Sequence, residues 1–261
     1  MTTEMIIIHI FYLVDNALLD VKRASRAKLY PSEVVTIGIL FALKGGHFGA
    51  FYRWLKRDYE ALFYELPDRT ALLRQLRVYE TLTDRLMASA TILNVADTLP
   101  VELLFPLRAG RSDQQLGAKS LDKGRWSVGV KMGWILNQHN EVCGWIWDRM
   151  NVHDNQFLDF LGNYHDEGII LTDYGFRCAA GIPDNVKLCA KGTWNDRMSI
   201  ETAASVVTVL SQAKKIFHRK AAYVEARFAY LATMFNVLRT LYQQLYPAEP
   251  KSKISLAEFS L

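Results

Sequence analysis

The sequence predicts an α/β protein in which an all-helical region, residues 1–88, precedes a domain of mixed strands and helices, residues 89–248, and a tail, 249–261. Up to residue 88, apolar residues recur at the three- and four-residue spacing of amphipathic helices. From residue 91 the predicted order is three strands, then helix, strand, helix, strand and helix. Half of the 261 residues are hydrophobic, so a substantial core can form.

Four helices are predicted in the first region, over about 3–20, 32–44, 49–65 and 68–80. Ser32 is the predicted N-cap of the second helix and Asp68 that of the fourth. The fourth helix has an apolar inner face and directs four polar residues outward: Thr70, Arg74, Gln75 and Arg77. Such side chains contact base edges and phosphates when a short helix enters a major groove. We therefore predict a helix-turn-helix-like DNA-binding region, the alternative being an ordinary amphipathic helix with solvated arginines.

The second region begins with the strand TILNVA, residues 91–96, and a polar loop over 107–125. Two strands then flank a turn at 137–140, and a helix starts near Asp154, which is predicted to cap it. A strand over 168–172, a short helical turn and a strand over 186–190 follow. The chain is predicted to be helical from about 195 to about 246.

Three acids fall at related places in this order. Asp97 follows the first strand, Asp173 follows the fourth, and Glu201 lies at the border of the apolar face of the last long helix. Arg197, one turn before Glu201, is placed to keep this acid ionised. A single aspartate at a strand end is usually a turn cap, but three acids without clustered His or Cys suit Mg²⁺, which prefers oxygen ligands. Two such ions about 4 Å apart promote phosphodiester cleavage.

The motifs around these acids are VADTLP at Asp97, LTDYGF at Asp173, WNDRMSIE ending at Glu201, and the hairpin region from KGRWSVGV to NVHD. Over residues 30–240 the chain resembles the bacterial insertion-sequence transposases of the DDE class, which carry an RNase H-like catalytic domain. The resemblance implies an RNase H-like mixed sheet flanked by helices. It also implies strand cleavage and strand transfer at the ends of an insertion sequence, with two Mg²⁺ (or Mn²⁺) ions held by Asp97, Asp173 and Glu201.

The partners implied by the resemblance are double-stranded DNA and a second copy of the chain in the DNA complex. The sequence departs from the family at Thr208 and Tyr174, which occupy positions that are often basic. These differences leave the predicted metal ligands untouched and concern contacts with the DNA end.

Positive charge is concentrated late in the chain: after residue 201 there are eight Lys or Arg residues and only three Glu. Four residues of this segment are predicted to contact phosphate: Lys214, Lys215, Arg219 and Lys220. The alternative is a solvated helix face. Two further functions stay open, namely a Mg²⁺-dependent nuclease that does not transpose and a DNA-binding regulator without catalysis.

The three cysteines, Cys143, Cys178 and Cys189, show no C-x-x-C spacing, which favours a reducing compartment over a disulfide framework or a zinc site. The apolar opening, residues 5–14, is too short to cross a bilayer. The sequence therefore predicts a cytoplasmic protein without a membrane partner.

Overall fold

The protein is described by a computed structural model that places residues 1–122, 124–190, 198–250, 253 and 255–261. The chain forms two compact units. The helical unit comprises Met1–Met87, Val209–Glu249 and Ser255–Leu261, and the sheet unit comprises Ala88–Thr208 and Pro250–Ile254. The fold is thus mixed α/β, with the first 87 residues entirely helical in their regular structure.

The helical unit contains α1 (Thr3–Ala17), α2 (Pro31–Lys44), α3 (Phe48–Asp58), α4 (Arg69–Val78) and α7 (Ala221–Leu245). Short 3-10 turns cover Glu60–Leu62, Glu80–Leu86 and Ala257–Phe259. The predicted cap of α4 is confirmed, because Asp68 accepts hydrogen bonds from the backbone N–H groups of Thr70 and Ala71. Helices α1 and α3 end earlier than predicted, at Ala17 and Asp58.

The predicted cap of α2 is wrong. The N-cap residue is Tyr30, and Ser32 is buried inside the first turn. The Glu33 carboxylate accepts from the Tyr30 N–H at 2.7 Å and from the Tyr64 N–H at 3.1 Å. Glu33, at the third helical position, thus accepts from a backbone N–H that has no partner within the helix. Pro31 fits the first helical position because it has no N–H that would need a partner.

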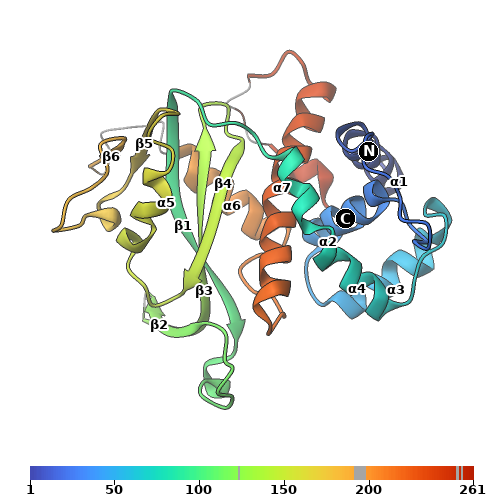
Figure 1. The fold of residues 1–261 in the computed structure, drawn as a ribbon, viewed down its shortest axis with the longest axis horizontal. Helices are drawn as coiled ribbons and strands as arrows, with labels where there is room; N and C mark the ends of the chain where they lie inside the picture. Colours follow the sequence, from blue (N-terminus) through green and yellow to red (C-terminus); the bar gives the residue numbers. More distant parts are fainter. Residues whose placement is uncertain (123, 191–197, 251–252, 254) are drawn as a thin grey trace. The chain divides into compact units, whose positions relative to one another are not determined.

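Helix α7 is the centre of the helical unit. Its residues are buried on all sides, and it packs against α1, α2, α4 and the turn Glu80–Leu86 (Figure 1). The Tyr230 hydroxyl donates to the Leu76 carbonyl at 3.0 Å, and the Arg227 guanidinium donates to the carbonyl of Phe41. The expected division placed residues up to 248 with the sheet. The contacts within the chain instead group residues 209–249 with the N-terminal helices. A helix that is apolar on all sides must be covered on all sides by other elements.

Residues 211–220 are not helical, contrary to prediction. Helix α6 (Met198–Leu210) and α7 are separate, and the chain between them turns at Gln212, whose φ is +53°. This left-handed conformation ends a helix because the next N–H can no longer bond to the carbonyl four residues earlier. The predicted phosphate-contacting residues therefore lie on an irregular connection.

In the described part of the sheet unit, six strands form one mixed sheet. They are β1 (Leu93–Leu104), β2 (Ala118–Asp122), β3 (Arg125–Asn137), β4 (Val142–Arg149), β5 (Ile169–Thr172) and β6 (Val186–Leu188). The order is β2-β3-β1-β5-β6, with β4 also on β3. Strands β1, β2 and β4 run antiparallel to β3, while β5 and β6 continue the sheet parallel to β1.

Two strand predictions need correction. Strand β1 does not stop at Ala96 but continues to Leu104, so Asp97 lies within it. The predicted loop over 107–125 contains β2, which pairs with the start of β3. Pairing explains the first error: β3 accompanies β1 from Asn94 to Leu104, whereas β5 pairs only as far as Val95. Pro100 is tolerated because one side of β1 carries no partner strand there.

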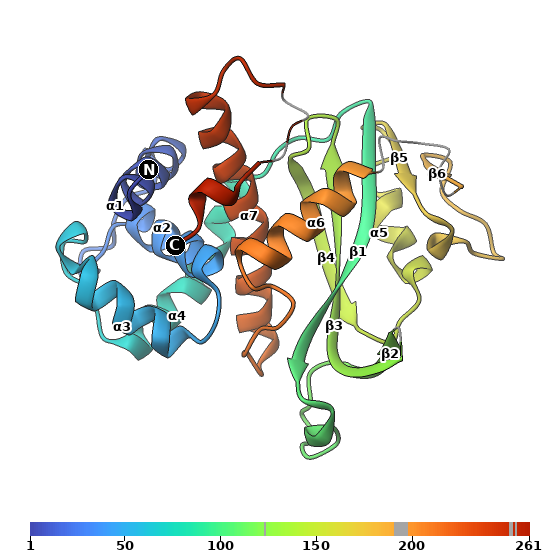
Figure 2. The same cartoon turned by 180° about the vertical axis from the view of Figure 1, so that it is seen from behind.

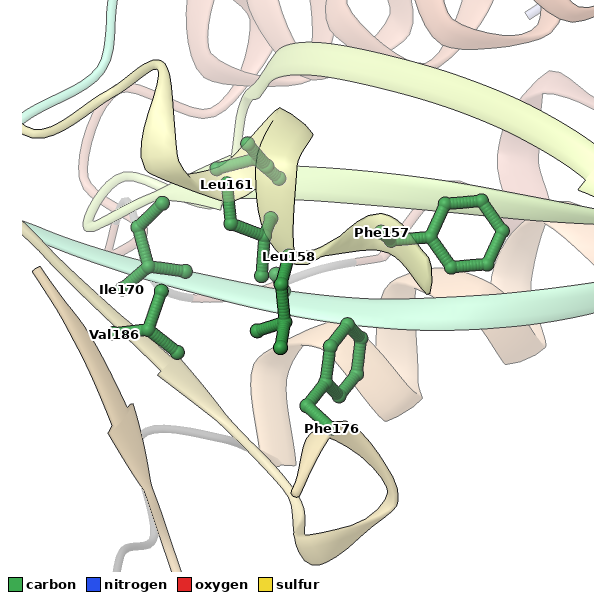
Figure 3. Packing of buried hydrophobic residues seen from close by; sticks show 8 residues of the cluster. Phe157, Leu158, Leu161, Ile170, Phe176 and Val186 are labelled. Carbon is green, nitrogen blue, oxygen red and sulfur yellow. The ribbon is translucent and has the colours of Figure 1, made fainter. Parts of the chain in front are cut away.

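Helices α5 (Leu158–Gly162) and α6 lie on opposite faces of the sheet (Figures 1 and 2). On the α5 face, Phe157, Leu158 and Leu161 pack against strand residues and Phe176 to form a buried cluster (Figure 3). Ala96 of β1 belongs to this cluster. Because side chains alternate along a strand, the neighbouring Asp97 points to the opposite face.

Within the described residues, no single helix is both long and apolar enough to cross a membrane, and α2 with α3 passes that test only as a pair bent by 117°.

Candidate active site

Two of the predicted acids belong to neighbouring parallel strands: Asp97 lies in β1, and Asp173 directly follows β5. Leu93 of β1 pairs with Ile169 of β5, and Val95 pairs with Leu171. The same offset carried forward places Asp97 opposite Asp173, which directly follows the last residue of β5. Adjacent strands are about 4.8 Å apart, and paired residues share a face of the sheet. If the register continues to these residues, the two acids lie on neighbouring positions of the sheet although they are far apart in the sequence.

Local hydrogen bonds hold both carboxylates. Asp97 Oδ1 accepts from the Thr98 N–H at 2.7 Å, and Asp173 Oδ1 accepts from the Gly175 N–H at 2.8 Å. The second bond makes Asp173 the N-cap of the short 3-10 turn Tyr174–Phe176. The capping role and a functional role are thus compatible, because one carboxylate oxygen makes the cap and each carboxylate has several acceptor positions.

Asp154 is a third acid at this place, and its predicted role as a helix cap is wrong. Its Oδ1 accepts from the Thr98 hydroxyl at 2.8 Å and from Lys131 Nζ at 2.9 Å. Its Oδ2 faces Gly175: a Cβ on that glycine would stand 2.7 Å from Asp154 Oδ2 and 2.8 Å from Asp173 Oδ1. The carboxylates of Asp154 and Asp173 therefore approach each other across the bare backbone of Gly175.

Lys131 balances the charge of this acidic group. Its side chain is only 16% exposed, and its Nζ also donates to the Val152 carbonyl at 2.8 Å. A lysine in the middle of a largely buried strand was the sequence signal for a hidden acid partner, because a buried charge is costly without one. The sequence alone could not identify this partner as Asp154, because Asp154 reaches Lys131 only once β3 and β4 have paired in the sheet.

Glu201 is exposed in the first turn of α6, next to the buried Ile200. It lies on the helix that covers the sheet face to which Asp97 points (Figure 2). Arg197, predicted to orient Glu201, lies outside the described residues. Thr208, at the position often basic in the resembled family, is buried and donates its hydroxyl to the Ser205 carbonyl at 2.9 Å.

The three aspartates, Asp97, Asp154 and Asp173, fit Mg²⁺ by chemistry, because they offer carboxylate oxygens with no His or Cys among them. In the portion of the chain that the structure describes, no three His, Cys, Asp or Glu side chains form a group that could hold a metal ion. Asp97, Asp173 and Glu201 therefore all remain predictions as metal ligands.

The residues predicted to contact DNA fall in the helical unit. On α4, Thr70, Arg74 and Arg77 are exposed as predicted, and the Arg77 guanidinium lies 5.9 Å from the centre of the Tyr223 ring. Gln75 departs from the expected outward direction, since its Oε1 is buried and has no hydrogen-bond partner among the residues that the structure describes. Gln75 is therefore not presented to a groove in this conformation.

The late basic residues also remain accessible. Lys214, Arg219 and Lys220 are exposed, and Lys215 is partly buried. They lie on the connection between α6 and α7, on either side of Phe217 and His218, rather than on a helical face. Burial and the neighbouring Arg227 guanidinium lower the pKa of His218 to about 4, so this imidazole is neutral at pH 7.

Comparisons of the chain with protein-family models, curated proteins and solved structures found no match.

Proposed function

We propose that this protein is a DNA transposase of the DDE class, whose sheet unit is an RNase H-like catalytic domain that cleaves and transfers DNA strands with the help of divalent metal ions. The observation that supports this best is the parallel pairing of β1 with β5, because its register, continued by two residues, would set Asp97 opposite Asp173. The mixed sheet with a helix on each face and the position of Glu201 on α6 agree with the arrangement expected of that domain.

Asp97, Asp173 and Glu201 would hold two Mg²⁺ or Mn²⁺ ions. When bound, such ions activate a water or hydroxyl and stabilise charge on the leaving oxygen of a phosphodiester. The chain supplies the frame for them. Backbone N–H groups fix one oxygen of Asp97 and one oxygen of Asp173.

Asp154 acts as a positioning residue in this proposal. The Thr98 hydroxyl ties it to the residue after Asp97, and the Gly175 gap sets it against Asp173. Lys131 keeps the summed negative charge of the three aspartates tolerable before a cation arrives. Removing Lys131 would leave the aspartate carboxylates without a compensating cation, and their repulsion would move them apart.

Double-stranded DNA is the proposed partner, contacted by Thr70, Arg74 and Arg77 of α4 and by Lys214, Lys215, Arg219 and Lys220. The support is the exposure of most of these cations within one compact unit. Phosphate contacts of this kind provide affinity that falls steeply with salt. A homodimer in the DNA complex is part of the same proposal.

The test is to incubate the protein and Mg²⁺ with labelled DNA that carries the ends of its own element, together with an unlabelled target plasmid. A transposase yields both cleaved ends and labelled plasmid. Cleaved ends alone would favour the nuclease alternative. DNA binding without any Mg²⁺-dependent product would favour a regulator and would contradict the proposal.

A further inference from the structure

A second site lies in the helical unit. It is a half-open cavity of about 310 Å³ formed by the turn before α3, the start of α4 and the connection between α6 and α7. Thr70 of α4 and Phe217 of the connection both line it. Two segments that the sequence predicts to contact DNA, far apart along the chain, thus meet at one cavity.

One wall of this cavity is aromatic. The rings of His47 and Phe217 stack with their centres 3.6 Å apart and their planes inclined by 26°. Both residues are exposed, and Phe217 is 39% exposed although it is large and apolar. A flat ring with an accessible face can take a further planar ring, and base stacking on such a side chain is sequence-tolerant because every base has a π-face.

Arg69 lines the cavity opposite this wall, and Arg53 lies beside it without being part of the lining. Gly49 has no side chain, and a Cβ there would stand 3.5 Å from Arg69 Nη1 and 3.8 Å from Arg53 Nη1. Two guanidinium groups therefore converge over the start of α3. Among the described residues, neither arginine takes part in an ion pair. Converging like charges without a carboxylate create a strong local preference for an anion, and guanidinium groups match phosphate.

We propose that this cavity binds one unpaired nucleotide of a DNA strand, with its phosphate against Arg53 and Arg69 and its base against Phe217. The proposal rests on the proposed function only for DNA as the partner. A paired base is stacked inside the duplex and cannot enter a cavity, whereas an unpaired base can be received by an aromatic ring. The volume suits a single nucleotide and not a helix of DNA.

The test compares a fluorescent duplex that has a short single-stranded overhang with the blunt duplex of the same sequence, in the absence of divalent metal. We expect the wild-type protein to bind the overhang duplex about tenfold more tightly, the size of one base–aromatic stack. Phe217→Leu should remove this preference while leaving affinity for blunt DNA unchanged. Arg53→Ala with Arg69→Ala should remove it too. Lys56→Ala, which removes one exposed charge from α3, and Tyr12→Leu, which removes another exposed ring, should keep it.

Three results would overturn the proposal: equal affinity for both duplexes, equal losses on both in Phe217→Leu, or competition by inorganic phosphate as effective as that by a deoxynucleoside monophosphate. The last result would show that the cavity binds phosphate but does not recognise the base. Failure here is distinguishable from failure of the proposed function. Mg²⁺-dependent strand transfer without an overhang preference removes only the cavity proposal, and an overhang preference without any cleavage removes only the transposase.

Discussion

At the scale of single residues, the hydrogen bonds of Thr98, the charge of Lys131 and the missing side chain of Gly175 bear on three acids: Asp97, Asp154 and Asp173. Thr98 connects two of them, giving its N–H to Asp97 and its hydroxyl to Asp154. Lys131 supplies the compensating charge. The absent side chain of Gly175 supplies the space, so the geometry depends on one glycine as much as on the acids.

Gly175→Ala should therefore impair the proposed metal site. The new methyl would lie less than 3 Å from an oxygen of Asp154 and an oxygen of Asp173, so at least one carboxylate must move. We expect Mg²⁺-dependent cleavage to fall by roughly 100-fold or more, as misplaced catalytic groups cause. Measuring the cleavage rate and the melting temperature together separates this from unfolding.

Gly162→Ala is the matched control, because its Cβ would stand 3.4 Å from Pro183, at ordinary contact distance. It should leave the rate near that of the wild type. Unchanged cleavage in Gly175→Ala would show that the acids around it do not serve the reaction.

His218 gives the helical unit a pH dependence. Its pKa in the folded protein is about 4, against about 6.5 in an unfolded chain, because of burial and the charge of Arg227. Its ring also lies near the rings of Phe41 and Tyr223. As the pH falls below about 6.5, the unfolded chain gains a proton that the folded state does not take, so the free energy of unfolding decreases.

His218→Phe should remove this dependence. Between pH 7 and pH 5 we expect wild type to lose on the order of 2 kcal/mol more than the variant in urea unfolding. Equal losses in the two proteins would mean that His218 is protonated in the folded state at pH 5.

At the scale of elements, α2 and α7 depend on a close approach. Gly38 of α2 lies directly against the ring of Tyr230, and a Cβ there would overlap ring atoms. Tyr230 is fully buried and its hydroxyl is held by the Leu76 carbonyl, so the ring has no room to move. Gly38→Ala should lower the free energy of unfolding by about 1–3 kcal/mol, as overpacking does, despite the better helix propensity of alanine. A variant as stable as the wild type would contradict this packing.

Helix α4 carries the prediction for DNA recognition. Arg74→Ala with Arg77→Ala should lower affinity for all DNA and flatten the dependence of log affinity on log salt by roughly two units if both contact phosphate. If they contact bases, preference for the element's ends over random DNA should be lost instead. Fluorescence anisotropy at several salt concentrations measures both. Unchanged affinity, salt slope and preference would move recognition to the basic connection between α6 and α7.

The elements that sequence predicted well are those fixed by local chemistry. Asp68 caps α4 where its side chain meets nearby N–H groups, and Asn140, in the left-handed conformation, closes the turn between β3 and β4. The elements it missed are fixed by distant partners. The extension of β1 past Asp97 exists because β3 accompanies it, and the break at Gln212 interrupts a stretch that is apolar enough to read as one helix.

The same division applies to the candidate site. Asp97 and Asp173 stand out in the sequence because each follows an apolar segment with a clear local pattern, and their role as metal ligands stays a prediction. Asp154 could not, since its role depends on Thr98 and Lys131, which are brought to it by sheet pairing. Its local sequence predicted a helix cap, but in the fold its carboxylate makes long-range hydrogen bonds instead.

At the scale of the whole molecule, the proposed function assigns a different task to each of the two compact units. The proposed chemistry belongs to the sheet unit, and the proposed DNA contacts belong to the helical unit. The central claim is that the acids aligned on β1 and β5 perform metal-dependent strand cleavage. Most of the other proposals for the sheet unit depend on it.

The measurement that tests this claim most directly is the Mg²⁺-dependent cleavage rate of Asp97→Asn and Asp173→Asn on labelled element ends, with DNA affinity measured in parallel. Asp159→Asn, which changes an exposed acid on α5, is the control. The account predicts that both site variants lose cleavage by at least about 1,000-fold while binding DNA as well as the wild type, and that the control cleaves normally. Cleavage that persists in either site variant at the rate of the control would contradict it.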